Sequence, residues 1–436
     1  MARIKLVYIG GGGTRGPGTL ESFLHHADSF KGSEIVLVDT DEKGLRLVEK
    51  LAQKMAKSRS ADVTISATTD RRAALKDAHA VLSSFRPGGF EARVVDETIP
   101  LKYNIIGQET QGPGGFFMAL RSIHILKDIA LDMQELCPNA FLFNYTNPVN
   151  IVSQALADFS PIKQVSLCEG PIAFAQHQAE WAGLDPAKVD VLMIGLNHAC
   201  WSVRSLYDGK PLIPLLTQAY ERLKKDPNAV PYRTRLLGLS VMMDSIPSQY
   251  FRYYYFHEEE VAEVRAAGKT RSQEILTQTD DYWAHYREQL DLPTPRLDPN
   301  RSRGGIHEFE LAVHVIDSMF NNKGQTWPVN IVNRGNPSPL PGFHSDLVVE
   351  VPATIDLRGV HPIPQGPLPR HLTPLLNMLG EYQVLAAHAA WKGSRKDAIR
   401  ALAANPLVLS MTKATAMYDE MAAALRQYLP ERLLKD

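Results

Sequence analysis

The sequence has no apolar run long enough to span a membrane, and its first residues lead directly into a short apolar segment without the charged and apolar regions of a signal peptide. It has only three cysteines in 436 residues, Cys137, Cys168 and Cys200, and this number does not suggest a disulfide framework. Each cysteine is therefore expected to be a buried thiol or a ligand. Together these absences predict a cytoplasmic protein that does not bind a membrane.

An excess of charge of one sign is also missing. The 47 basic and 48 acidic residues leave a formal net charge of −1, so no global field attracts nucleic acid. The chain length predicts about two domains. We expect the first domain over residues 1–200 and the second over residues 201–436.

The chain is organised around residues 4–18, IKLVYIGGGGTRGPG, where an apolar run is followed by clustered glycines. Glycines at such a turn let backbone N–H groups approach a pyrophosphate at the N-terminus of the next helix. Gly11, Gly13 and Gly16 have the spacing of a dinucleotide-binding loop, although four consecutive glycines fit several registers. The alternative is a glycine-rich loop without a ligand.

A second apolar run, residues 35–38, strengthens the dinucleotide interpretation because it ends in Asp39. Dinucleotide-binding folds place an acidic residue at this point, about 20 residues after the glycines, to bind the ribose hydroxyls. The strand, glycines, helix, strand and acid form one consistent unit.

Apolar and amphipathic segments alternate as far as residue 205. Strands are expected at residues 63–67, 80–85, 140–143, 164–167 and 189–194, and residues 86–115 are expected to form a loop. Such alternation predicts an α/β fold with a doubly wound parallel sheet of Rossmann type. Ligands of these sheets bind beyond the carboxyl ends of the strands, so the loops there should carry the chemistry.

After residue 205 the alternation fades, which indicates a second, α+β region. Helices are expected at residues 214–224, 258–288, 307–319 and through most of 371–434, and strands at 327–333 and 346–355.

Two of the expected strands end in possible metal ligands, Cys168 and His198, which are 30 residues apart. If the two strands were adjacent and parallel, both side chains would lie at one edge of the sheet beside the nucleotide. A thiolate and an imidazole suit a borderline transition metal with positions left open for substrate. By spacing alone, a buried cysteine and a capped histidine are the commoner explanation.

Other candidate residues have equally ordinary alternatives. Arg93 and Arg271 suit bidentate binding of a phosphate, but surface charges are commoner. Glu109 and Glu169 lie in loops bounded by glycines, where a carboxylate serves as an acid or a base, although exposed glutamates are usually bystanders. Tyr250 belongs to a tyrosine cluster, and as a base it needs a nearby cation to lower its pKa from about 10.

Seven ordered segments of the chain resemble glycoside hydrolase family 4, the NAD- and metal-dependent glycosidases, and in particular its 6-phosphoglycosidase branch. They are IGGGGTRGPGTL, RPGGFEARVVDETIPLKYNIIGQETQGPGG, NYTNPVNIV, LCEGP, GLNHACW, IPSQYFRYYY and KTRSQEIL. A weaker match continues through RGGIHEFELAVHVI, VNIVNRGNPSPLPG and LVVEVP. Seven motifs in order are far more specific than any one of them. The resemblance implies a sheet like that of lactate and malate dehydrogenases. We therefore expect residues 1–200 to form a nucleotide-binding domain with metal ligands at its strand ends, and residues 201–436 to form a mixed α/β, largely helical domain for substrate binding and oligomerisation.

The resemblance also implies roles for the candidate residues. Cys168 and His198 match the manganese ligands of the family, with the sugar O2 and O3 completing the coordination. Tyr250 matches the tyrosine that acts as a base. Arg93 and Arg271 match the arginines that bind the sugar 6-phosphate.

Further matches concern the sugar and the nucleotide. Asn147 matches a residue that contacts the sugar, and Glu109 is expected to do the same. The residues expected to bind NAD are Gly11, Gly12, Gly13, Thr14 and Asp39. Glu169 departs from the pattern, since the maltose-6-phosphate type has Asp there and the cellobiose-6-phosphate type has Asn. A glutamate can still protonate a leaving group. Arg15 departs as well, from small or aromatic residues.

The function implied is hydrolysis of 6-phospho-α- or 6-phospho-β-glucosides, in a family known to depart from the two-carboxylate mechanism. NAD oxidises C3 with the divalent metal, most simply Mn²⁺, polarising the ketone; C2 is then deprotonated, the C1 substituent is eliminated, water adds and C3 is reduced again. Family members commonly form homodimers or homotetramers. The alternatives are a glycosidase of this family acting on a non-phosphorylated sugar, a lactate- or malate-type dehydrogenase, and a nucleotide sensor without activity.

Overall fold

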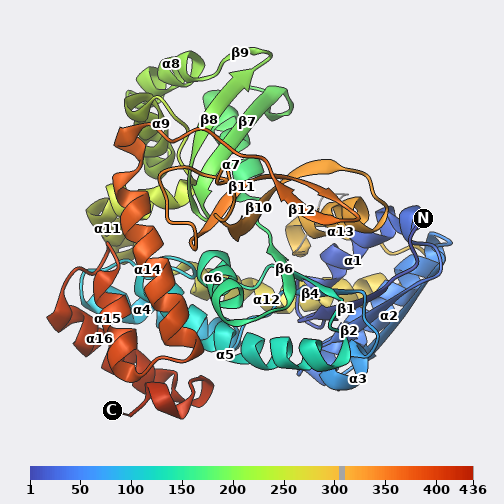
Figure 1. The fold of residues 1–436 in the computed structure, drawn as a ribbon. Coiled ribbons are helices and arrows are strands. Elements are labelled where there is room, and N and C mark those ends of the chain that lie inside the picture. The colour runs from blue at the N-terminus through green and yellow to red at the C-terminus, as the bar shows by residue number, and fades with distance from the viewer. Residues whose placement is uncertain (304–309, 436) are drawn as a thin grey trace.

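The computed structural model describes residues 1–303 and 310–435, and one mixed sheet runs through this part of the chain (Figure 1). Its strands are β1 (Lys5–Ile9), β2 (Ser33–Val38), β3 (Val63–Thr68), β4 (Ala80–Ser83), β5 (Phe141–Asn144), β6 (Lys163–Ser166), β7 (Val189–Leu196), β8 (Ala199–Tyr207), β9 (Lys210–Pro211), β10 (Gln325–Val332), β11 (Val348–Asp356) and β12 (Gly359–Pro362). The strand order is β3-β2-β1-β4-β5-β6-β10-β11-β7-β8-β9, and β12 pairs with β11.

Helices cover both faces of this sheet (Figure 1). They are α1 (Gly16–His25), α2 (Glu42–Ser58), α3 (Arg71–Leu75), α4 (Gly89–Lys102), α5 (Gly112–Leu136), α6 (Val149–Phe159), α7 (Gly170–Ala182), α8 (Ile213–Leu223), α9 (Pro231–Met243), α10 (Arg252–Tyr255), α11 (His257–Ala267), α12 (Arg271–Asp291), α13 (Leu311–Phe320), α14 (Pro374–Trp391), α15 (Arg395–Ala404) and α16 (Met411–Ala424). In the described ranges, none of them is long and apolar enough to cross a membrane.

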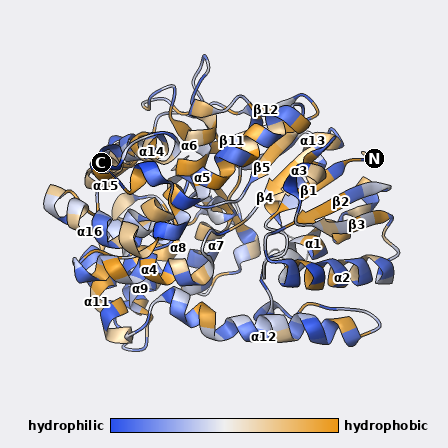
Figure 2. Cartoon of the chain, turned by 90° about the horizontal axis from the view of Figure 1, so that it is seen from below, coloured by the Kyte–Doolittle hydropathy of each residue, from blue (hydrophilic) through white to orange (hydrophobic). Residues whose placement is uncertain are grey.

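Strands β1 to β6 form the parallel half of the sheet, in the order β3-β2-β1-β4-β5-β6. Their residues are mostly apolar because helices bury both faces. Figure 2 shows this contrast, with apolar colours along β1 and β4 and mixed colours along α2 and α12. The predicted doubly wound Rossmann-type sheet is confirmed for this half.

The loop expected over residues 86–115 is wrong in its first part, because residues 89–102 form α4. The helix is hard to recognise in the sequence because its buried face is largely polar: Arg93, Asp96 and Glu97 are all buried. An apolar repeat, the usual signal of an amphipathic helix, is therefore weak here.

The second half of the sheet differs from the prediction. Strands β10 and β11 lie between β6 and β7, and each neighbouring pair in the order β6-β10-β11-β7 is antiparallel. The strands that precede Cys168 and His198 are thus not adjacent, and the predicted parallel pairing of them is wrong. β7 instead forms an antiparallel hairpin with β8. The same sheet includes β10 and β11, from residues 325–356, so it extends across the predicted domain boundary at residue 200. That boundary stays a prediction.

The long helix expected over residues 258–288 is two helices. Gly268 adopts a left-handed φ of +64° and ends α11. Thr270 then starts α12 with a capping box that involves Gln273. In the helix expected over 307–319, residues 307–309 lie outside the described residues, and α13 begins at Leu311.

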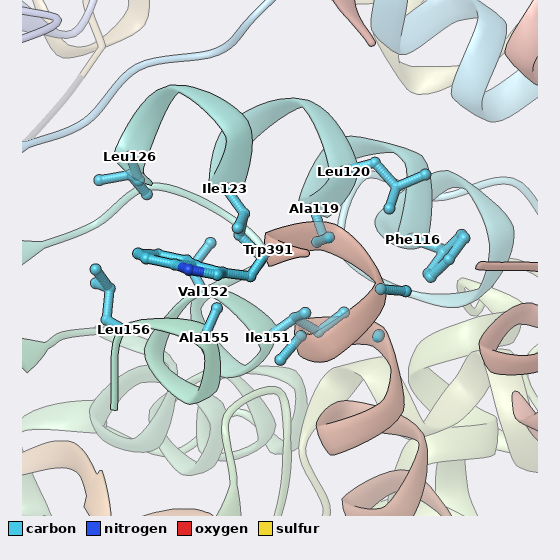
Figure 3. Close-up of a cluster of buried hydrophobic side chains, with 14 of the residues drawn as sticks. Phe116, Ala119, Leu120, Ile123, Leu126, Ile151, Val152, Ala155, Leu156 and Trp391 are labelled. Atoms are coloured by element: carbon cyan, nitrogen blue, oxygen red, sulfur yellow. The ribbon is translucent and has the colours of Figure 1, made fainter. Parts of the chain in front are cut away.

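The C-terminal helices join the parallel half through a large apolar core (Figure 3). The Trp391 indole, at the end of α14, lies between Ile123 and Leu126 of α5 and Val152 and Leu156 of α6. Full burial of each such side chain contributes about 1.5–3 kcal/mol to folding. This packing fixes α5 and α6 beneath the loops that carry the site.

Candidate active site

A cavity of about 440 Å³ opens beyond the carboxyl ends of β5 and β6, within the size range of small-molecule sites. Both halves of the sheet contribute to it. The predicted site residues among those that line it are Asn147, Cys168, Glu169, His198 and Tyr250. Arg15, Tyr145, Gln108, Phe174, His177 and Arg252 also line it.

The two predicted metal ligands lie together in this cavity. Cys168 follows β6, His198 lies in the turn between β7 and β8, and Sγ of Cys168 is 3.5 Å from Nε2 of His198. The Thr110 hydroxyl lies 2.9 Å from Nδ1 of His198, and the Gly170 N–H donates to the Cys168 sulfur at 3.3 Å. His198 has a φ of +62°, an unfavourable conformation for a side-chain-bearing residue, which the hairpin turn imposes.

Burial keeps both groups neutral. It raises the pKa of the Cys168 thiol to about 12, reinforced by the negative charge of Glu350, and it lowers the pKa of His198 to about 4. A neutral imidazole that is hydrogen-bonded through Nδ1 and faces a thiol through Nε2 suits metal binding, and a bound cation deprotonates a thiol. The donor set therefore fits a divalent transition metal.

The protein supplies few ligands at this point. In the part of the chain that the structure describes, no group of three or more His, Cys, Asp or Glu side chains is arranged to hold a metal ion. With only Cys168 and His198 as donors, a bound ion would keep several positions for oxygens of another molecule, as catalytic rather than structural metal sites do.

Tyr250 covers the imidazole of His198. The two rings stack with centroids 3.8 Å apart and planes 12° apart. The Ser248 hydroxyl ties the pair together, since it donates to the His198 carbonyl oxygen (2.7 Å) and accepts from the Tyr250 N–H (3.3 Å). Burial raises the pKa of Tyr250 well above its usual value, so this residue is a phenol unless a cation lies close to it.

Another part of the cavity wall is charged. Arg15 Nη2 lies 2.8 Å from Oε1 of Glu310 and 3.4 Å from Oε1 of Glu169, and the Tyr145 hydroxyl donates to the same Glu169 oxygen at 3.0 Å. Burial raises the pKa of Glu169, the Arg15 charge opposes this rise, and the Glu310 charge adds to it. No motif or spacing in the sequence singled out Tyr145 or Glu310.

The glycine turn adjoins this wall. The Gly12 N–H donates to Oδ2 of Asp39 at 3.0 Å, and a Cβ on Gly12 would lie 2.8 Å from the Asp39 Cβ. A Cβ on Gly16 would lie 2.3 Å from the Gly11 carbonyl oxygen, so the turn requires glycine at both positions. The Thr14 carbonyl accepts a hydrogen bond from a tyrosine hydroxyl of α12 (2.7 Å).

Helix α1 begins at Gly16 and has no side-chain cap, so its first N–H groups point out of the helix without such a partner. Uncapped N–H groups and the positive end of the helix dipole form an anion site. Together with Asp39 at the end of β2, the turn fits a dinucleotide.

Arg93 lies outside the residues that line the cavity, in a buried ion-pair network. Its Nη1 is 2.6 Å from Oε2 of Glu109 and its Nε is 2.6 Å from Oε1 of Glu97. Arg86 reaches the other Glu109 oxygen at 2.5 Å. Burial alone would raise the pKa of Glu109, but the charges of Arg86 and Arg93 lower it to about 2. Glu109 is therefore a carboxylate that orients two arginines.

Arg271 is not brought into the cavity. It is the first residue of α12, its side chain is 64% exposed, and it pairs with Glu274 at 3.1 Å. The next residue, Ser272, donates to Glu97 through its N–H (2.8 Å) and its hydroxyl (2.6 Å). Because Glu97 also binds Arg93, the start of α12 is fixed beside the Arg93 network.

Glu350 is a buried acid that the sequence did not single out as a site residue. It lies on β11, opposite Gly195 of β7. The side-chain amides of Asn197 and Asn330 donate to its Oε1 at 2.8 and 3.0 Å. Burial raises the pKa of Glu350 to about 7, although both amides oppose the rise. The negative charge of ionised Glu350 helps to raise the pKa of the Cys168 thiol.

Known proteins match nearly the whole chain. The model of "Family 4 glycosyl hydrolase" matches residues 5–184, and that of its C-terminal domain matches residues 193–408. A "Probable 6-phospho-beta-glucosidase" of Bacillus subtilis is 35% identical over 441 residues, which cover 98% of each chain. The 6-phospho-beta glucosidase of Thermotoga maritima, solved with manganese, NAD+ and glucose-6-phosphate, has a TM-score of 0.82 and 26% identity over 97% of this chain and 99% of its own.

The lactate dehydrogenase of Eimeria maxima shares the fold alone, with a TM-score of 0.55 and 14% identity over 93% of this chain and 96% of its own. The predicted likeness to lactate and malate dehydrogenases is thereby confirmed for the sheet. The two family models together cover well over half of the sequence, and the full-length relative is more than 30% identical. The chain belongs to glycoside hydrolase family 4.

Proposed function

We propose that the protein hydrolyses 6-phosphorylated glucosides with NAD and a divalent cation, most simply Mn²⁺, as cofactors. The observation that carries the proposal is one cavity lined by Cys168, His198, Tyr250 and Glu169, in which the Cys168 sulfur lies against His198 and Tyr250 stacks on the same imidazole. A thiol and an imidazole for a metal, a phenol for proton removal and a carboxyl for proton donation therefore face one space. The names of the relatives support a phosphoglucoside as substrate.

When bound, NAD supplies reversible hydride transfer at C3, and a cation at Cys168 and His198 supplies positive charge that acidifies C2 and favours a tyrosinate. Tyr250, held over His198, is the base that takes the C2 proton. Glu169, which lines the same cavity, donates a proton to the oxygen that leaves C1. The glycine turn and Asp39 orient the nucleotide, and Asn147 holds the sugar by hydrogen bonds.

We propose that Arg93 and Arg271 bind the sugar 6-phosphate. A planar guanidinium binds phosphate bidentately, and Glu97 and Glu109 hold Arg93 in a fixed orientation. Arg271 is held only by an exposed ion pair, which is worth about 1 kcal/mol or less, so it can turn towards another anion. The residue after Arg271, Ser272, donates to Glu97, and Glu97 also pairs with Arg93. The backbone of Arg271 is therefore held beside the Arg93 network.

We further propose that the protein is a cytoplasmic homodimer or homotetramer. Light scattering of the purified protein checks the oligomeric state, and a monomeric mass would refute it.

The function is tested with a panel of p-nitrophenyl α- and β-glucosides, each with and without a 6-phosphate, in the presence of NAD⁺, Mn²⁺ and a reductant. We expect turnover of a 6-phosphorylated substrate, loss of turnover after chelation, and no stoichiometric accumulation of NADH. Cleavage of free glucosides with equal efficiency would favour a non-phosphorylated sugar. NADH accumulating in proportion to substrate would indicate a dehydrogenase instead.

A further inference from the structure

Arg15 is a cation in an unfavourable place. It is the N-cap residue of α1, where the helix dipole repels positive charge, and it directly follows the turn that the nucleotide is proposed to contact. Its side chain lines the cavity. The proposed nucleotide site does not account for this position.

Glu310 accounts for it. The Glu310 side chain is fully buried (0% exposed), and its Oε1 lies 2.8 Å from Arg15 Nη2. Its other oxygen accepts a hydrogen bond from Thr19 of α1 at 3.1 Å. A buried carboxylate needs a paired cation, so Arg15 is anchored from the interior of the molecule.

The outer side of Arg15 meets Glu169, whose side chain is 34% exposed. Arg15 Nη2 and the Tyr145 hydroxyl both approach Oε1 of Glu169, at 3.4 and 3.0 Å. The Arg15 guanidinium also lies 5.2 Å from the centre of the Tyr145 ring, and the Ala312 N–H donates to the Tyr145 oxygen at 2.9 Å. Two anchored groups therefore converge on one oxygen of a flexible side chain.

We propose that Arg15 is a positioning residue that, anchored on Glu310, holds the Glu169 carboxyl at the cavity wall where the leaving group departs. Glutamate has three side-chain torsions, so without such contacts its carboxyl samples several positions. The inference deepens the proposed function and rests on it for the role of Glu169. It makes the glycine turn a support for the sugar site as well as for the nucleotide.

The test compares two substrates of the anomer that the wild type cleaves. A p-nitrophenyl 6-phosphoglucoside has a leaving group that needs no proton, whereas a methyl 6-phosphoglucoside needs one. We expect Arg15→Met to lower kcat about 10²-fold on the methyl substrate and about threefold or less on the p-nitrophenyl substrate, because only the first depends on acid catalysis. Arg15→Lys should recover part of the loss.

Three further measurements identify the partner of Arg15. In a Glu169→Gln background, Arg15→Met should lower the methyl-substrate rate by about twofold or less, because the acid is already gone. The NAD dissociation constant of Arg15→Met, measured by fluorescence, should stay within about threefold of the wild-type value. Arg204→Met, which removes an exposed arginine from its pair with Asp190, is the matched control and should leave both rates unchanged.

Arg15→Met removes the cation that lies 2.8 Å from buried Glu310, so Arg15→Met/Glu310→Gln replaces it if Arg15→Met does not fold. Equal losses on both substrates together with weaker NAD binding would overturn the inference and assign Arg15 to the nucleotide. If the wild type hydrolyses no phosphoglucoside, the proposed function fails. The contact between Arg15 and Glu169 is then tested by the melting temperatures of Arg15→Met, Glu169→Gln and Arg15→Met/Glu169→Gln. Additive shifts would then overturn it.

Discussion

The parallel and antiparallel halves of the sheet supply the cavity with opposite kinds of groups. The loops after β1, β5 and β6 bring Arg15 and Glu169, which form an ion pair, and Tyr145, whose hydroxyl donates to Glu169. The antiparallel half brings His198 and the neighbouring Tyr250, which are neutral and stacked. Cys168 lies on the parallel side but faces the stacked pair.

This difference indicates that the two walls act in different steps. On the charged wall the ionic partners are already in place, so proton donation needs no large rearrangement. On the neutral wall burial opposes ionisation of the thiol and the phenol, so both need a cation before they react. We therefore expect hydrolysis of every substrate to stop without the metal on the neutral wall. Loss of a group from the charged wall should slow only substrates whose leaving group needs a proton.

The largest effect should follow loss of a metal ligand. Cys168→Ser should lower Mn²⁺-dependent hydrolysis by about 10³-fold, since metal catalysis contributes several kcal/mol. Rates measured across a Mn²⁺ titration check this, and Cys137→Ser, a buried thiol at the end of α5, is the control. An unchanged wild-type rate after chelation and dialysis would contradict the ligand assignment.

Tyr250→Phe tests the second member of the neutral wall. We expect kcat to fall about 10²-fold, the usual cost of losing a general base, while KM changes little because the ring still stacks on His198. The effect should be the same for methyl and p-nitrophenyl leaving groups, unlike that of Arg15→Met. Tyr255→Phe, on the following short helix α10, is the control. Full activity of Tyr250→Phe would exclude this residue as the base.

The phosphate assignment is tested by the preference for phosphorylated over free glucosides. Arg93→Ala should lower this preference about 10²-fold, because a charge-assisted hydrogen bond contributes about 1.5–3 kcal/mol. Arg271→Ala should lower it about tenfold, because its exposed side chain is more strongly screened. A preference that survives both substitutions would refute the assignment.

A smaller effect, on stability, is expected at Glu350. Its pKa is raised to about 7 in the folded protein, so the folded state holds a proton that the unfolded state has lost. The free energy of unfolding should therefore fall as the pH rises from about 4.5 to about 7, by up to about 3 kcal/mol. Urea unfolding of Glu350→Gln should lack this part of the pH dependence. The same pH dependence in both proteins would show that Glu350 is not its source.

Much of the parallel half could be predicted because its signals are local. Each apolar run predicted to be a strand in this half overlaps a strand of the structure, and the glycine turn and Asp39 lie next to one another as expected. Helix α4 was missed because ion pairs, centred on Arg93, replace the apolar face that reveals a helix.

The remaining site depends on contacts between distant parts of the chain. Cys168 and His198 do meet, as expected, but their strands are not neighbours. Strands β10 and β11 lie between them, and nothing in the sequence near either residue indicates this insertion. Arg15 and Glu310 are 295 residues apart, and neither sequence context indicates the other. Motif order identified the candidate residues, but only the three-dimensional packing shows that Arg271 is exposed.

The most direct test of the proposed chemistry is to follow the hydrogen at C2 of the sugar. Hydrolysis of the preferred 6-phosphoglucoside in D₂O with NAD⁺ and Mn²⁺, analysed by NMR and mass spectrometry, reports whether that hydrogen is removed during turnover. We predict deuterium at C2 of the glucose-6-phosphate released. A product that retains its original C2 hydrogen throughout turnover would contradict the account.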